Sequence, residues 1–220
     1  MCVKLISVKA LLMHRLIRTE ADLADGMAWL AAQEPLFATA FAATGPLPLR
    51  NRPDGFASLL SAIVSQQLSV ASAAAIWKRL QQADLTAAHT MALASDDGLR
   101  AAGLSRQKIR YARALADSGI DFIGLRQCED AQVVALLTDV SGIGVWTAEI
   151  YTMFSLSRAD IFAPGDLALQ ESARSLFGLP ERPKERALRD MAEAWSPWRS
   201  VAARLLWSYY RVIKKREGIA

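Results

Sequence analysis

Hydrophobic residues recur every three to four positions along most of this chain, which is the spacing of amphipathic helices. Phe56 and Leu59 begin one such run, and Thr19, followed by Glu20 and Asp22, is typical of a helix start. No alternating polar and apolar run exceeds a few residues, so we predict an all-α fold. Further helices are predicted over residues 70–81, 86–93, 96–102, 106–117, 130–137, 167–177, 183–195 and 197–214.

Three polar or glycine-rich breaks interrupt the helical pattern. Ser65–Ser69 separates two helices, Gly142-Ile143-Gly144 joins two more, and Pro164-Gly165-Asp166 precedes another helix start. We expect positive φ at the glycines that flank Ile143. Behind this hairpin the first amides of the next helix lack helical partners and point outward. A turn of this kind is suited to hold a phosphate oxygen with main-chain N–H groups.

Each of these features also has an ordinary structural interpretation. The glycine hairpin is compatible with a simple turn between helices, and Gln66-Gln67 with a helix junction. Asp166 stands where an aspartate commonly caps a helix. The six tryptophans suit an aromatic core as well as a ligand pocket. None of the features identifies a function by itself.

Composition narrows the class of protein. The 220 residues are 52% hydrophobic and 22% charged, which excludes a disordered chain. A net charge of +4 is compatible with nucleic-acid binding. Cys2 and Cys128 are too few for a disulfide framework or a four-cysteine metal cluster, and His14 and His89 lie outside every motif. With so few cysteines a reducing cytoplasm is the expected compartment, and there is no apolar run of membrane length.

Four segments, taken together, resemble one known family: the helix-hairpin-helix (HhH-GPD) DNA glycosylases, in particular the DNA-3-methyladenine glycosylase II branch. The resemblance extends from about Thr19 to Tyr210 and covers nearly the whole chain. It is carried by Leu137-x-x-Val140-x-Gly142-Ile143-Gly144-x-Trp146-Thr147-Ala148, Pro164-Gly165-Asp166, Ile63-Val64-Ser65-Gln66-Gln67-x-Ser69 and Pro197-Trp198-Arg199-Ser200.

The resemblance implies two helical lobes with an active-site cleft between them. Residues 19–55 with 166–220 would form lobe one, and residues 56–165 would form lobe two, which ends in the hairpin motif. Residues 1–18 are expected to be a weakly ordered leader, and Met13 offers a second start.

The resemblance also implies an activity: a monofunctional glycosylase that flips alkylated purines of the 3-methyladenine and 7-methylguanine type out of DNA and hydrolyses the N-glycosidic bond. Asp166 matches the catalytic aspartate, which would stabilise the cationic sugar. Trp146 stands where bifunctional members carry a lysine nucleophile, so no strand cleavage (AP-lyase activity) is expected.

Other positions are assigned through the same resemblance. Trp146 and Trp207 would line the base pocket, where an indole face attracts a cationic base by cation–π contact. Ile150 and Leu167 occupy pocket positions that are aromatic in well-known relatives, which leaves the lesion range open. Gln67, with Gln66 beside it, would fill the gap left by the flipped nucleotide. The phosphate-binding backbone would be Gly142, Ile143, Gly144 and Val145, and the carbonyls of Thr138, Val140 and Ile143 would hold Na⁺ or K⁺.

Double-stranded DNA with alkylated bases is therefore the expected partner, bound in the bacterial-type nucleoid by a monomer without a cofactor. Arg106, Arg110 and Arg113 form a basic stripe that is either solvated or in contact with phosphate; Arg199 and Lys214–Arg216 would add diffuse attraction. Three alternatives stay open: a non-catalytic hairpin module that binds DNA, a glycosylase for another lesion class, and a helical scaffold for protein partners.

Overall fold

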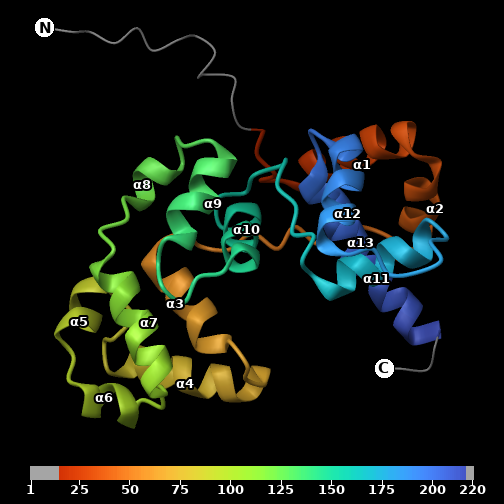
Figure 1. The fold of residues 1–220 in the computed structure, drawn as a ribbon. Helices are drawn as coiled ribbons and strands as arrows, with labels where there is room; N and C mark the ends of the chain where they lie inside the picture. Colours follow the sequence, from red (N-terminus) through yellow and green to blue (C-terminus); the bar gives the residue numbers. More distant parts are fainter. Residues whose placement is uncertain (1–14, 217–220) are drawn as a thin grey trace, which may run out of the picture. The chain divides into compact units, whose positions relative to one another are not determined.

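The structure, a computed structural model, describes residues 15–216 and confirms the all-α prediction. Figure 1 shows the arrangement of its helices. Over these residues, β-type pairing is limited to one bridge between Leu16 and Arg158. The helices are α1 (Glu20–Gln33), α2 (Pro35–Thr44), α3 (Phe56–Ser65), α4 (Val70–Gln82), α5 (Ala88–Leu93), α6 (Asp96–Ala101), α7 (Arg106–Asp117), α8 (Phe122–Leu125), α9 (Asp130–Thr138), α10 (Val145–Phe154), α11 (Leu167–Leu176), α12 (Glu185–Ala192), the short 3₁₀ turn η2 (Glu193–Trp195) and α13 (Arg199–Arg216).

Two helices were not predicted from the pattern of apolar positions. In α2, Pro35 stands at the first helical position and Glu34 caps the start by accepting from the amide of Leu36. The single turn α8 is capped by Asp121, whose carboxylate accepts from two amides of that turn. Both helices are short and depend on their caps, which periodicity alone does not detect.

The chain divides into two compact units. One is continuous and spans Arg52–Leu156; we call it unit 2. The other, unit 1, is made from both sides of it and includes the described residues 15–51 and 157–216. The predicted border between the lobes was therefore misplaced. Residues 157–165 belong to unit 1, and residues 52–55 belong to unit 2.

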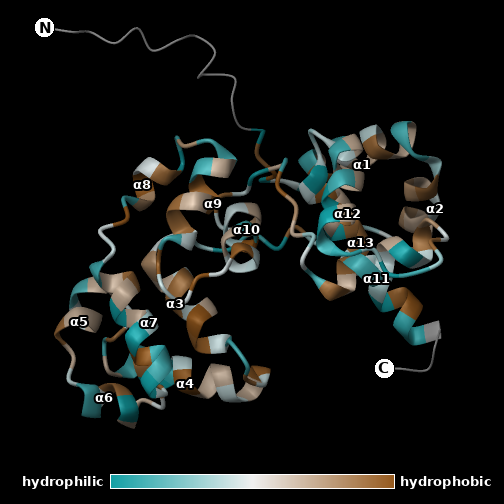
Figure 2. Cartoon of the chain, in the orientation of Figure 1, coloured by the Kyte–Doolittle hydropathy of each residue, from teal (hydrophilic) through white to brown (hydrophobic). Residues whose placement is uncertain are grey.

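Unit 2 is built around α3. This helix is mostly apolar, with serines as its only polar residues, whereas α7 carries many charged and polar residues (Figure 2). Helices α4, α7 and α10 pack against α3. Leu59, Leu60 and Ile63 of α3 are fully buried and form one cluster with apolar residues of α7, α9 and α10. The core therefore fixes α3 and α10, the two helices that later supply most of the pocket.

Unit 1 is organised by α13, which contacts α1, α2 and α11. An aromatic group made by Phe37, Phe162, Phe177 and Trp195 supports it, with ring centroids 5.3 to 5.9 Å apart. Trp195 and Trp198 are buried, as the aromatic-core interpretation expected. Edge-to-face contacts of this kind are worth roughly 1 kcal/mol each beyond their burial.

The predicted leader is wrong for its last residues. Ile17 is fully buried, and its N–H donates to the carbonyl of Ser157 at 2.8 Å. The Ala159 N–H donates to the carbonyl of Arg15 at 2.9 Å, so this segment is an integral part of unit 1. Residues 1–14 lie outside the described part of the chain. Between residues 15 and 216, no helix has the length and apolar character needed to cross a membrane.

Candidate active site and DNA interface

The hairpin between α9 and α10 contains two glycines that differ in backbone conformation and in the space around them. Gly142 has φ of 97°, and a Cβ there would overlap the ring of Tyr111 on α7. Gly144 has φ of −85°, so the expected positive φ was wrong at this position. A Cβ on Gly144 would meet no atom within 4 Å. Gly142 is therefore required by the fold, whereas Gly144 keeps an open surface.

Gly144 is also the N-cap of α10, and it offers no side chain to the first amides of that helix. Ile143 anchors the turn from below, because it is buried and its N–H donates to the carbonyl of Val140 at 3.0 Å. The start of α10 thus presents main-chain N–H groups at an unobstructed surface, where the helix dipole favours a negative ligand.

The break between α3 and α4 is a tight turn of the type II class. Gln66 has φ −55° and ψ 129°, Gln67 has φ 56°, and the Leu68 N–H donates to the carbonyl of Ser65 at 3.3 Å. This turn type normally places glycine at the residue with positive φ. A glutamine in that conformation costs about 1 kcal/mol. Backbone strain at an exposed polar residue is common at binding sites.

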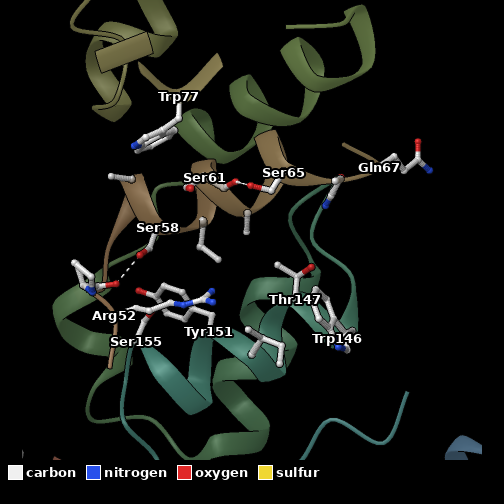
Figure 3. A pocket seen from close by; sticks show the side chains of 16 residues that line it. Arg52, Ser58, Ser61, Ser65, Gln67, Trp77, Trp146, Thr147, Tyr151 and Ser155 are labelled. Carbon is white, nitrogen blue, oxygen red and sulfur yellow. Dashed lines mark hydrogen bonds between the residues drawn. The ribbon is translucent and has the colours of Figure 1, made fainter. Parts of the chain in front are cut away.

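The two glutamines of the turn have separate roles. The Gln66 side chain donates to the carbonyl of Gly142 at 2.9 Å and so joins the turn to the hairpin. Gln67 is exposed, and its amide points away from the other labelled side chains in Figure 3. Gln67 is therefore the better candidate to enter DNA, while Gln66 is held inside the protein surface.

A pocket of about 940 Å³ opens in unit 2 between α3 and α10. Trp146 and Ile150 both line it, as do Ser61 and Ser65 of α3 and Trp77 of α4. Figure 3 shows the indoles of Trp77 and Trp146 at opposite ends of the view. Trp146 is 48% exposed, so much of its indole stays accessible at the surface. The pocket combines aromatic walls with small hydroxyl-bearing residues.

Tyr151 of α10 also borders this pocket. Its hydroxyl accepts the Gly55 N–H at 2.8 Å. Burial raises the pKa of Tyr151 to about 12, since the charged phenolate would be poorly solvated there. Tyr151 consequently ties α10 to the start of α3 and closes one side of the pocket.

Asp166 lies in unit 1, at the start of α11. Its Oδ1 accepts from the amides of Ala168 and Leu169 at 2.9 and 3.2 Å, so the N-cap interpretation is correct. The turn before it is fixed by buried Gln170, whose side chain donates to the carbonyl of Pro164 at 2.8 Å. The side chain of Asp166 is half-buried rather than enclosed. A capping role and a catalytic role are compatible, because the cap holds the carboxylate in one orientation.

Leu167 and Trp207 share unit 1 with Asp166. Leu167 is the first residue of α11 and is 62% exposed, and Trp207 is half-buried on α13. Neither residue is among those that line the pocket of unit 2. The predicted base-pocket set is thus divided between the units: Trp146 and Ile150 in one, Leu167 and Trp207 in the other.

Two of the basic residues considered for DNA contact have structural partners instead. Arg113 donates to the carbonyls of Ala92 and Ala94 at 3.0 and 2.7 Å and pairs with Asp96, so it joins α7 to the α5–α6 connection. Arg199 makes two bonds to Asp160, at 2.8 and 3.0 Å. Arg106 and Arg110 remain exposed on α7.

A cation supported by the hairpin carbonyls would have to share them with existing hydrogen bonds. The Val140 carbonyl already accepts the Ile143 N–H, although a carbonyl oxygen retains a second lone pair. The Thr138 hydroxyl donates to the carbonyl of Val134 at 2.9 Å. Within residues 15–216 there is no group of three or more His, Cys, Asp or Glu side chains arranged to bind a metal.

Known proteins resemble this chain in both sequence and fold. The profile of the HhH-GPD superfamily of base excision DNA repair proteins matches residues 60–197. DNA-3-methyladenine glycosylase 1 of Schizosaccharomyces pombe is 27% identical over 71% of this chain and 73% of its own length. A DNA-3-methyladenine glycosidase structure from Bacillus halodurans is 34% identical, with a TM-score of 0.79, over 92% of this chain and 94% of that one.

A second solved structure, the S. pombe 3-methyladenine DNA glycosylase in complex with abasic DNA, is 26% identical. It superimposes with a TM-score of 0.70 over 83% of this chain and 95% of that one. The hairpin, the turn at Gln66–Gln67 and Asp166 all lie within the matched profile. The chain belongs to the HhH-GPD superfamily of base excision DNA repair proteins.

Proposed function

We propose that this protein is a monofunctional DNA glycosylase that extrudes alkylated purines from duplex DNA and hydrolyses their N-glycosidic bond. The relatives named above are 3-methyladenine glycosylases, which supports this substrate class. The observation that carries the proposal is the half-buried Asp166 carboxylate, which the first amides of α11 hold in a fixed orientation.

Hydrolysis of the N-glycosidic bond of an alkylated purine does not require a strong general acid. A purine alkylated at a ring nitrogen is already cationic, so when the bond from C1′ to nitrogen breaks, the electron pair neutralises the departing base. Positive charge then develops on the sugar. The fixed carboxylate of Asp166 stabilises that charge, and water adds to C1′ with loss of a proton. The products are the free base and an abasic site.

Selection of the base would fall to Trp146 and the pocket beside it. An electron-rich indole face attracts a cationic base by roughly 1–2 kcal/mol. Ile150 provides an apolar wall of the same helix instead of a further aromatic ring. This discrimination is modest, so much of the preference for alkylated purines comes from the lability of their glycosidic bonds.

Backbone binding would rest on the start of α10. The first amides of α10 follow an N-cap residue without a side chain and lie next to an open surface, which suits a phosphate oxygen. Carbonyls of Thr138, Val140 and Ile143 would hold a Na⁺ or K⁺ ion there and add positive charge next to the phosphate. Replacement of K⁺ by tetramethylammonium at constant ionic strength would then weaken duplex binding, and equal affinity in both salts would remove the cation from the proposal.

The absence of lyase chemistry follows from Trp146, because an indole cannot attack the sugar as an amine does. The test uses duplexes that each carry one lesion: 3-methyladenine, 7-methylguanine, hypoxanthine or 8-oxoguanine. We expect release of the alkylated purines, with strand breaks appearing only after alkali. Release of oxidised bases alone, or strand cleavage without alkali, would contradict the proposal. We further propose that a monomer acts on nucleoid DNA in the cytoplasm, which sedimentation of the protein–duplex complex and cell fractionation would test.

A further inference from the structure

The turn that carries Gln67 does not hold its shape unaided. Gln67 has φ of 56°, a conformation that a side chain other than glycine disfavours. Two long backbone hydrogen bonds hold the turn: the Leu68 N–H donates to the carbonyl of Ser65 and the Gln66 N–H donates to the carbonyl of Ile63, each at 3.3 Å. A segment with only long hydrogen bonds of this kind and an unfavourable backbone angle benefits from side-chain support that favours a single conformation.

Lys108, in the first turn of α7, provides the first support. Its Nζ donates to the carbonyl of Val64 at 2.6 Å and to the carbonyl of Gln66 at 2.8 Å. These two carbonyls lie at the end of α3 and inside the turn, where a positive charge also complements the helix dipole. Burial lowers the pKa of Lys108, because the ammonium group is partly withdrawn from water. The Lys108 ammonium group thus hydrogen-bonds to two carbonyls that flank the start of the turn.

Gln66 provides the second support. Its side chain donates to the carbonyl of Gly142 at 2.9 Å, which joins the turn to the hairpin across a separation of 76 residues. The hairpin in turn lies on Tyr111, which occupies the space a Cβ of Gly142 would need. Tyr111 is three residues after Lys108 and so lies on the same side of α7. One helix thereby contacts both the turn and the hairpin.

We propose that Lys108 and Gln66 are positioning residues for excision, and that they hold Gln67 in its left-handed conformation at a fixed separation from the phosphate-binding hairpin. The hairpin would grip the backbone while Gln67 enters the base stack, and the two actions require one rigid surface. This inference rests on the proposed role of Gln67 in filling the gap of a flipped nucleotide.

The test is a double-mutant cycle read as affinity for a duplex with an abasic-site analogue. Lys108→Met removes the two bonds to the turn, and we expect binding to weaken roughly tenfold. Gln67→Gly removes the wedge and also adopts positive φ without cost. In that background Lys108→Met should change affinity less than about twofold. A full tenfold loss in both backgrounds would overturn the proposal.

Arg79→Met is the matched control. Arg79 also belongs to unit 2, and its Nε donates to the carbonyl of Ala102 at 2.8 Å, near the end of α6. It thus loses a similar bond between a cation and a carbonyl, away from the turn. We expect it to lower the melting temperature without changing the affinity for abasic duplex. An equal loss of affinity in Arg79→Met would mean that Lys108 acts through general stability, which would also overturn the proposal.

Gln66→Met gives an independent measurement, because it deletes only the bond to Gly142. It should show the same non-additivity with Gln67→Gly, and it should slow excision from duplex DNA more than excision from single-stranded DNA, where no base pair must be opened. Equal slowing on both substrates would reject a positioning role. If the wild type releases no alkylated purine from either substrate, the proposed function fails, while the binding cycle still decides the role of Lys108 and Gln66.

Discussion

Helices α10 and α11 both begin just after a glycine-containing turn, yet their first amides are satisfied in opposite ways. In α11 the carboxylate of Asp166 accepts hydrogen bonds from two of these amides. In α10 the capping residue is Gly144, which has no side chain to offer. The start of α11 is capped by the protein's own carboxylate, whereas the start of α10 is suited to bind an anion of a ligand. In the function proposed above, the start of α11 presents the catalytic carboxylate and the start of α10 binds the DNA backbone.

The largest effect is expected for Asp166→Asn. Asparagine caps a helix about as well as aspartate, so the melting temperature should barely change. The loss of the negative charge beside the sugar should slow base release by roughly 100- to 1,000-fold. Single-turnover release of methylated purines from alkylated duplex DNA measures this. A variant that keeps more than half of the wild-type rate would reduce Asp166 to a cap.

Gly142→Ala should be the most damaging change to the fold among the hairpin residues. The positive φ and the contact with Tyr111 together should lower the free energy of unfolding by about 2–3 kcal/mol. Gly144→Ala is the matched comparison, since φ of −85° and open space should limit its cost to about 0.5 kcal/mol. Urea denaturation of both variants tests this, and equal losses would show that the two glycines are equivalent.

Gly144→Asp would give α10 the same kind of start as α11. The new carboxylate should stabilise the helix by a few tenths of a kcal/mol and should weaken duplex binding by roughly tenfold or more, because it takes the amides and repels phosphate. Gly144→Asn is the control that caps without charge. Titration of duplex DNA at several salt concentrations measures the effect. Unchanged affinity in Gly144→Asp would remove the start of α10 from the DNA interface.

The smallest effect concerns how α10 is held despite its open start. Tyr151→Phe removes the acceptor of the Gly55 N–H and should cost about 1 kcal/mol at neutral pH. The raised pKa of Tyr151, about 12, means that folding favours the protonated phenol. This contribution is complete below pH 10 and is lost as the pH rises toward 12, by an amount on the order of 2 kcal/mol. Wild type should therefore lose more stability than Tyr151→Phe over that interval.

Local signals in the sequence were sufficient where chemistry and periodicity agree. The break at Ser65–Ser69 and the cap at Asp166 were both predicted, because a polar interruption and an Asp before an apolar run have direct local meaning. The two glycines looked alike in sequence, however. What separates Gly142 from Gly144 is the ring of Tyr111, more than 30 residues earlier in the chain, so no local rule could distinguish them.

Local sequence rules were also insufficient for the basic residues of α7. Arg113 was grouped with Arg106 and Arg110 by helical spacing, yet it hydrogen-bonds to carbonyls about 20 residues away. Lys108 was overlooked, because nothing in a polar stretch of sequence reveals that its ammonium reaches the end of α3. Spacing predicts which residues share a helix face, but it does not say what covers that face.

The insertion of unit 2 between the halves of unit 1 has a consequence for biosynthesis. Every residue of unit 2, which ends at Leu156, is synthesised before the second half of unit 1, which begins at Ser157. Helices α1 and α2 are made first but wait longest, since Phe37 packs on Trp195 and both helices contact α13. Since domains generally fold as units during translation, α1 and α2 cannot complete unit 1 until α13 has been synthesised.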